Sequence, residues 1–130
     1  MAKKYEKKLT PIRNYAELDM AMQSAGSWFI GSFMVEFVDS FDCFSTKEKK
    51  NQFIDYFYNE YCNDYETKAQ LRNQINIAIR IIESGLVEEA MRYVINTNDL
   101  KIGCDESKTN ARFMLERLAD GSSVLPEFEK

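Results

Sequence analysis

The chain contains no histidine among its 130 residues. Histidine is the commonest general base, proton shuttle and metal ligand of proteins, so its absence excludes histidine-based triads, H-E-x-x-H metal sites and histidine pH switches. A glycine-rich phosphate loop and a G-x-S-x-G nucleophile elbow are absent as well. The sequence therefore predicts a protein that is not an enzyme and that uses no cofactor and no metal ion.

Cysteines and long apolar runs are also scarce. The three cysteines, Cys43, Cys62 and Cys104, are an odd number without a close pair, which argues against a disulfide framework or a zinc site. The longest apolar run, residues 28–38, contains Glu36 and is too short to cross a bilayer. No apolar run of the kind that a secretory signal needs follows the lysine-rich start of the chain. We therefore expect a cytoplasmic protein without membrane contact.

Acidic residues outnumber basic ones beyond the N-terminus. The formal net charge is −4, and the first eight residues hold four lysines and one glutamate, so the remaining chain carries −7. An acidic body repels a phosphate backbone, which argues against direct nucleic-acid binding. Residues 1–9 are predicted to form a flexible basic tail.

Aromatic side chains, by contrast, are abundant and recur at helical spacing. Four phenylalanines follow one another at intervals of four residues: Phe29, Phe33, Phe37 and Phe41. This spacing places them on one face of an α-helix and predicts a long central helix from Ser27 to Phe44. Aromatic and β-branched residues also favour strands, so a strand over residues 28–38 is the alternative.

Capping patterns divide the rest of the chain into further helices. The pairs are Asn14 with Glu17, Ser45 with Glu48, and Thr67 with Gln70. Helices are expected to begin near Tyr15, Thr46, Lys68, Val87 and residue 105 or 107, with a kink or restart at Gly26-Ser27.

These elements predict an all-α fold, a compact bundle of four to five helices. The bundle is expected to comprise residues 10–121 as one domain, followed by a loosely attached tail, residues 122–130. Its core is predicted to contain Phe33, Phe37, Phe53, Phe57, Leu71, Ile75, Ile79, Ile82, Met91 and Leu115.

Tyrosines and acids gather between Asp55 and Glu66, where lysine and arginine are absent. Tyrosine combines a rigid apolar ring with a hydrogen-bonding tip, which suits interfaces, and carboxylates favour a basic partner. The predicted partner-binding residues are Asp55, Tyr58, Glu60, Tyr61, Asp64 and Tyr65. The alternative is that the tyrosines wall the core and the acids form a solvated rim.

A basic row, Lys68, Arg72 and Arg80, recurs at multiples of four residues. Such a row can contact a phosphate or carboxylate ligand, or it can pair with acids of neighbouring helices.

A different set of residues, Trp28, Gly31 and Val35, forms a second apolar flank of the central helix. We expect this flank to be covered by a second copy of the chain, in a two-fold homodimer.

These observations favour a small, acidic, non-catalytic interaction protein, an adaptor or inhibitor that binds a basic protein partner through the acidic-tyrosine residues. The second hypothesis is a module that binds or sequesters a small ligand or nucleotide in a pocket between helices, with Lys68, Arg72 and Arg80 as ligands. An enzyme that works with carboxylates, tyrosine or lysine is a third possibility. Small acidic helical chains also suit mobile-element inhibitors that mimic nucleic acid and block a host system.

Overall fold

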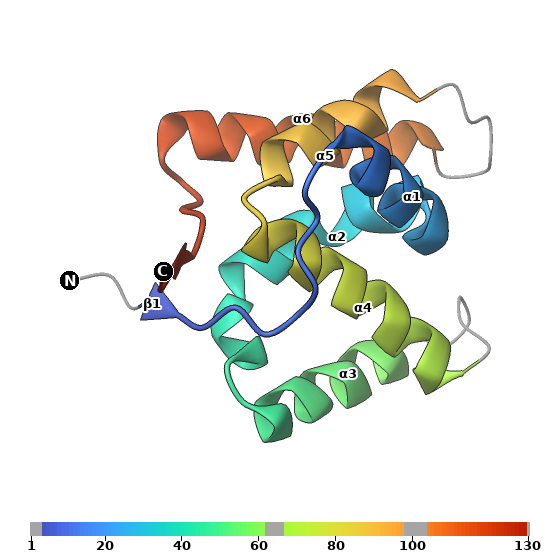
Figure 1. Ribbon diagram of the computed structural model, residues 1–130. Coiled ribbons are helices and arrows are strands. Elements are labelled where there is room, and N and C mark those ends of the chain that lie inside the picture. The colour runs from blue at the N-terminus through green and yellow to red at the C-terminus, as the bar shows by residue number, and fades with distance from the viewer. Residues whose placement is uncertain (1–3, 62–66, 98–103, 130) are drawn as a thin grey trace.

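A computed structural model of the protein describes residues 4–61, 67–97 and 104–129. Over these residues the fold is all-α, as predicted: six α-helices pack together with one short 3-10 helix and two strands of two residues (Figure 1). In chain order the elements are β1 (Lys4–Tyr5), α1 (Tyr15–Ala25), α2 (Ser27–Asp39), η1 (Phe41–Phe44), α3 (Lys47–Tyr61), α4 (Lys68–Glu83), α5 (Val87–Asn96), α6 (Cys104–Asp120) and β2 (Glu127–Phe128).

The described residues form six α-helices and not the predicted four to five, because the chain breaks at Gly26. Gly26 adopts a φ of +90°, a conformation that favours glycine. Its N–H closes α1 on the Met22 carbonyl, while its own carbonyl accepts the N–H of Ile30 at the start of α2. The predicted kink or restart is therefore a full break between two helices.

The central helix is shorter than predicted, and the strand alternative for residues 28–38 is wrong. Helix α2 ends at Asp39, and Phe41–Phe44 wind into the 3-10 helix η1. Because residues three apart eclipse in a 3-10 helix, Phe41 and Phe44 lie on one side, and both are buried with ring centroids 5.7 Å apart.

Two predicted caps are confirmed and one is wrong. The side chains of Asn14 and Thr67 accept the backbone N–H groups three residues on. At α3 the cap is Thr46, whose Oγ1 accepts the Lys49 N–H at 3.1 Å. The predicted cap, Ser45, is used otherwise: its hydroxyl donates to the Asp42 carbonyl at 2.7 Å and helps to end η1.

The core lies around α2, which contacts α1, α4, α5 and α6. Seven of the ten predicted core residues are buried. The other three, Phe33, Phe53 and Leu115, are half-buried and pack against the core. Phe33 lies at its edge, where its ring is 4.9 Å from that of Phe57 and 6.0 Å from that of Trp28.

The first and last strands of the described residues lie side by side, within the segments predicted to be a flexible tail, residues 1–9, and a loosely attached tail, residues 122–130. Strands β1 and β2 pair in parallel, with Lys4 opposite Glu127 and Tyr5 opposite Phe128, on one side of the bundle (Figure 1). The rings of Tyr5 and Phe128 both contact Phe41, at 5.1 and 5.6 Å. The apolar residues within the lysine-rich segment therefore attach it to the helices.

The segment from residue 4 to residue 13, named the strap from here on, runs across the end of α4. The buried carboxylate of Glu83 accepts the backbone N–H groups of Lys8 and Leu9 at 3.1 and 3.0 Å. The hydroxyl of Ser84 accepts the Ile12 N–H at 2.9 Å. These bonds satisfy strap donors that lack a strand partner, and they hold the strap over a cavity that is described below.

Candidate functional sites

The structure describes part of the predicted acidic-tyrosine residues. Asp55 and Glu60 are exposed on α3, and Tyr58 is half-buried. The side chain of Tyr61, together with Asp64 and Tyr65, lies outside the described residues. Lys68 already occupies the described part: its Nζ is 2.9 Å from Asp55 Oδ1 and 5.8 Å from the centre of the Tyr58 ring.

The basic row does not converge on one ligand. Lys68 points to α3, as its ion pair with Asp55 shows. Arg80 Nε donates to the carbonyl of Thr10 at 2.8 Å and so supports the strap. Arg72 is exposed. The row therefore serves, in two of its three positions, to bind neighbouring segments of the same chain.

The predicted dimer flank is partly inside the fold. Gly31 is buried, and a Cβ added there would lie 2.8 Å from Val94 Cγ1 and 3.0 Å from the Ser107 carbonyl oxygen. The close approach that Gly31 permits is thus made to α5 and α6 of the same chain. Trp28 and Val35 are half-buried and pack against the core. The homodimer stays a prediction, now with these two residues as its remaining contacts.

A cleft between α1 and α5 brings together tyrosines and acids that lie far apart in the sequence. It has a volume of about 430 Å³, and its walls include Tyr15, Asp19, Glu89, Arg92 and Tyr93. Each helix contributes a tyrosine and an acid four residues apart, so the two side chains share a helix face. That repeated spacing is visible in the sequence, but only the fold brings the two pairs together. We name this site the tyrosine cleft.

The tyrosine cleft has a defined hydrogen-bond network. The Tyr93 hydroxyl donates to Asp19 Oδ1 at 2.5 Å, and Gln23 Nε2 donates to Asp19 Oδ2 at 3.0 Å. The rings of Tyr15 and Tyr93 lie 6.3 Å apart, and Tyr15 is 70% exposed. Arg92 lies in the same wall, 2.6 Å from Glu88. An exposed aromatic ring therefore stands beside a second ring and an anchored carboxylate.

The hydrogen bond to Asp19, together with burial, raises the pKa of Tyr93 from 10.0 to about 12. The protonated phenol makes this bond, so its stabilising effect is complete below pH 10 and is lost as the pH rises through about 12.

We predict that a tyrosinate absorbance titration shows one phenol, that of Tyr93, ionising last in the wild type. Asp19→Asn should shift that step towards 10.0, and Tyr93→Phe should remove it. An unchanged titration in both variants would contradict the assignment.

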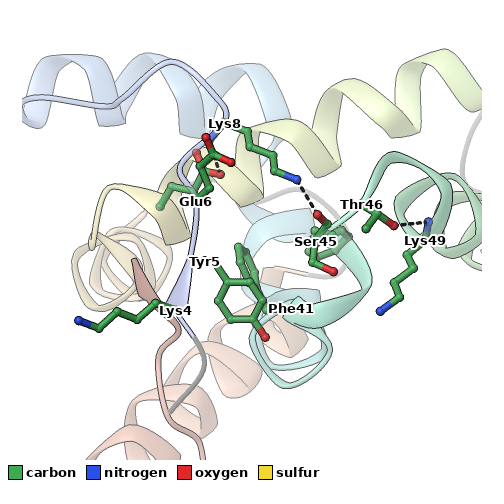
Figure 2. Close-up of a pocket in the computed structure, with 10 residues that line it drawn as sticks. Lys4, Tyr5, Glu6, Lys8, Phe41, Ser45, Thr46 and Lys49 are labelled. Atoms are coloured by element: carbon green, nitrogen blue, oxygen red, sulfur yellow. Dashed lines mark hydrogen bonds between the residues drawn. The ribbon is translucent and has the colours of Figure 1, made fainter. Parts of the chain in front are cut away.

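A second site lies under the strap, where η1, the start of α3 and the end of α4 meet (Figure 2). Its cavity has a volume of about 310 Å³ and is walled by Tyr5, Phe41 and Phe44 together with lysines of the strap and of α3. Figure 2 shows Lys8 extending from the strap to the carbonyl of Ser45, and this bond measures 2.6 Å. We name this site the strap cavity.

Within the described residues, no group of three or more histidine, cysteine, aspartate or glutamate side chains is placed to hold a metal ion. None of the described helices combines the length and the apolar character needed to cross a membrane. Comparison of the chain with protein-family models, with curated proteins and with solved structures found no match.

Proposed function

We propose that this chain is a non-catalytic interaction protein that docks on a basic protein partner, with the tyrosine cleft as its main contact. The observation that carries the proposal is the exposure of Tyr15, 70%, beside Tyr93 and the carboxylates of Asp19 and Glu89. Exposed tyrosines beside a second aromatic ring are typical of the anchor positions that dominate affinity in protein interfaces.

The chemistry of the tyrosine cleft favours a lysine or arginine side chain of the partner. A cation over a tyrosine ring is attracted by the ring face, and a nearby carboxylate adds charge attraction. Two side chains already hold Asp19 in place by donating to its two oxygens, so its carboxylate is oriented before any partner arrives. Arg92 shares the wall, but its guanidinium is 2.6 Å from Glu88, which offsets its charge.

The predicted face around Asp55 and Tyr58 is the second location for the same function. Lys68 there illustrates the expected contact, since its ammonium lies against a carboxylate and a tyrosine ring at once. A partner's cation would have to displace Lys68 from Asp55 at that face. We therefore place the main contact at the tyrosine cleft.

The test is photo-crosslinking from a single position in an extract of the source cells. A benzophenone amino acid replaces Tyr15 in one protein and Phe113 in another, because Phe113 is also an exposed aromatic residue, 48%, but lies on α6. We expect one protein with a basic segment to be captured from position 15 and not from position 113. With that partner purified, Tyr15→Ala should weaken binding by about 1–2 kcal/mol.

Further variants assign the location. Asp19→Asn should slow association, and more so at low ionic strength, because exposed charges are screened over about 10 Å at 0.1 M salt. Phe113→Ala should leave the affinity unchanged. A loss with Tyr58→Ala but not with Tyr15→Ala would move the site to α3. Equal capture from positions 15 and 113, or an affinity that none of these variants changes, would refute the proposed function.

A further inference from the structure

The strap cavity concentrates positive charge in a protein of net charge −4. An adjoining cavity of about 180 Å³ shares Lys8, Phe44, Thr46 and Glu83 with it. Together their walls contain two glutamates, Glu6 and Glu83, and five lysines, which are Lys4, Lys8, Lys47, Lys49 and Lys50. The lysines come from two segments about 40 residues apart, so the fold, not local sequence, creates this excess of three positive charges.

Two of the five lysines, Lys8 and Lys50, are held by neutral oxygens. Lys49 lies 3.1 Å from the carboxylate of Asp42, but the other four form no ion pair with a carboxylate among the described residues. Lys8 Nζ donates to the Ser45 carbonyl at 2.6 Å, and Lys50 Nζ donates to the Asn76 amide oxygen at 2.5 Å. These bonds fix the ammonium groups without neutralising them, which leaves their charge available to an anion.

Lys50 is the most constrained of the five. It is half-buried, and burial together with the nearby guanidinium of Arg72 lowers the pKa of its ammonium group. Lys8 adds to this effect, whereas Glu83 opposes it. The carboxylate of Glu83 accepts two strap N–H groups, so it is already engaged. A cationic cluster of this kind is relieved when an anion binds in it.

The remaining walls are apolar and aromatic. Tyr5, Phe41 and Phe44 line the strap cavity, and Leu9 and Ile79 line the adjoining one. The rings of Tyr5 and Phe41 meet edge to face at 5.1 Å, which keeps them in fixed positions (Figure 2). Pockets for small molecules typically combine such walls with a few polar groups that fix the ligand's orientation.

We propose that the strap cavity binds a small phosphate ester with a planar or apolar body, such as a nucleoside monophosphate. The phosphate lies at the border with the adjoining cavity, where it contacts Lys8, which lines both cavities, and Lys50, which lines the adjoining one. The body lies against the aromatic wall of Tyr5, Phe41 and Phe44. This site is separate from the tyrosine cleft and does not depend on the function proposed for it.

Isothermal titration calorimetry of the full chain with AMP and with inorganic phosphate tests the proposal. We expect AMP to bind at one site, and more tightly than inorganic phosphate, because only AMP can use the aromatic wall. Lys8→Gln and Lys50→Gln should each weaken AMP binding at least about tenfold, since each removes one charged phosphate contact. Glutamine removes the charge but keeps a hydrogen-bond donor at both positions.

Lys7→Gln is the matched control. Lys7 lies between two residues of the cavity wall, but its ammonium is directed to the Phe128 ring, 6.0 Å away, and it lines neither cavity. We expect its AMP affinity to stay within about twofold of the wild type. An equal loss in all three variants would show a non-specific charge effect and overturn the proposal.

A second readout separates the site from a membrane-binding patch and from the tyrosine cleft. Nuclear magnetic resonance of ¹³C-methylated lysines should show the pKa of Lys50 rising when AMP is bound, because the phosphate favours the charged ammonium. Absence of saturable AMP binding at millimolar concentration overturns the proposal, as does binding only to vesicles that contain anionic lipid. Tyr15→Ala should leave AMP binding unchanged, so failure of one proposal is distinguishable from failure of the other.

Discussion

Replacing Phe37 with alanine is expected to lower the free energy of unfolding by about 3–5 kcal/mol. Phe37 is completely buried on α2. Its ring centre lies within 6.4 Å of those of five other phenylalanines: Phe29, Phe33, Phe44, Phe53 and Phe57. Truncation removes the transfer free energy of the ring and leaves a cavity, because these neighbours belong to three different elements and cannot all move inward.

Urea denaturation of wild type and variant measures this loss from the change in midpoint at constant slope. Phe113→Ala is the matched control, because it removes the same side chain from an exposed position of α6. Its ring contacts Arg117 at 5.5 Å, so we expect a loss of about 1 kcal/mol or less. A Phe37→Ala variant that loses no more than Phe113→Ala would show that the ring cluster is not the centre of the core.

The helical architecture could be predicted because its signals are local. A spacing of four along the phenylalanines of α2, and caps such as Asn14 and Thr67, depend only on neighbouring residues. The break at Gly26 shows the limit of such signals. A glycine inside an apolar helical pattern is compatible with a kink or with two helices, and the choice depends on whether tertiary packing stabilises a φ of +90°.

The two candidate sites could not be predicted in the same way. The hydrogen bond between Tyr93 and Asp19 joins residues 74 positions apart, and the strap binds Glu83 across a similar distance. In the sequence, the strap lysines indicate a solvated tail, because lysine carries no signal of where its apolar stem will lie. Tyr5, Leu9 and Ile12 are the residues that attach the strap. Their spacing of four and then three residues would fit a helix, but the strap is not helical, so the pattern does not reveal how it lies.

The function assigned to Gly31 changes for a related reason. A small residue on an apolar helix indicates a close neighbour, but it does not say whether that neighbour belongs to the same chain. The contacts of Gly31 with Val94 and Ser107 identify α5 and α6 of the same chain as the neighbours.

Gly31→Ala should destabilise the protein by about 1–3 kcal/mol, although glycine to alanine in an unhindered helix stabilises by roughly 0.5–1 kcal/mol. The added Cβ would lie 2.8 Å from Val94 Cγ1 and 3.0 Å from the Ser107 carbonyl oxygen. The Val94 side chain can be shortened, but the carbonyl belongs to the backbone of α6. In a protein that already carries Val94→Ala, Gly31→Ala should therefore cost less free energy of unfolding than in the wild type, but it should still be destabilising.

Ser32→Ala, one residue further along α2, is the control, because its side chain is half-buried and the substitution adds no atoms. Thermal or urea denaturation at two protein concentrations distinguishes packing of Gly31 against α5 and α6 from packing against a second chain. If Gly31 packs against α5 and α6, the loss is the same at both concentrations. If it packs against a second chain, the loss grows with dilution and sedimentation shows a weaker dimer. A Gly31→Ala variant more stable than the wild type would contradict both arrangements, because each leaves no room for a methyl group.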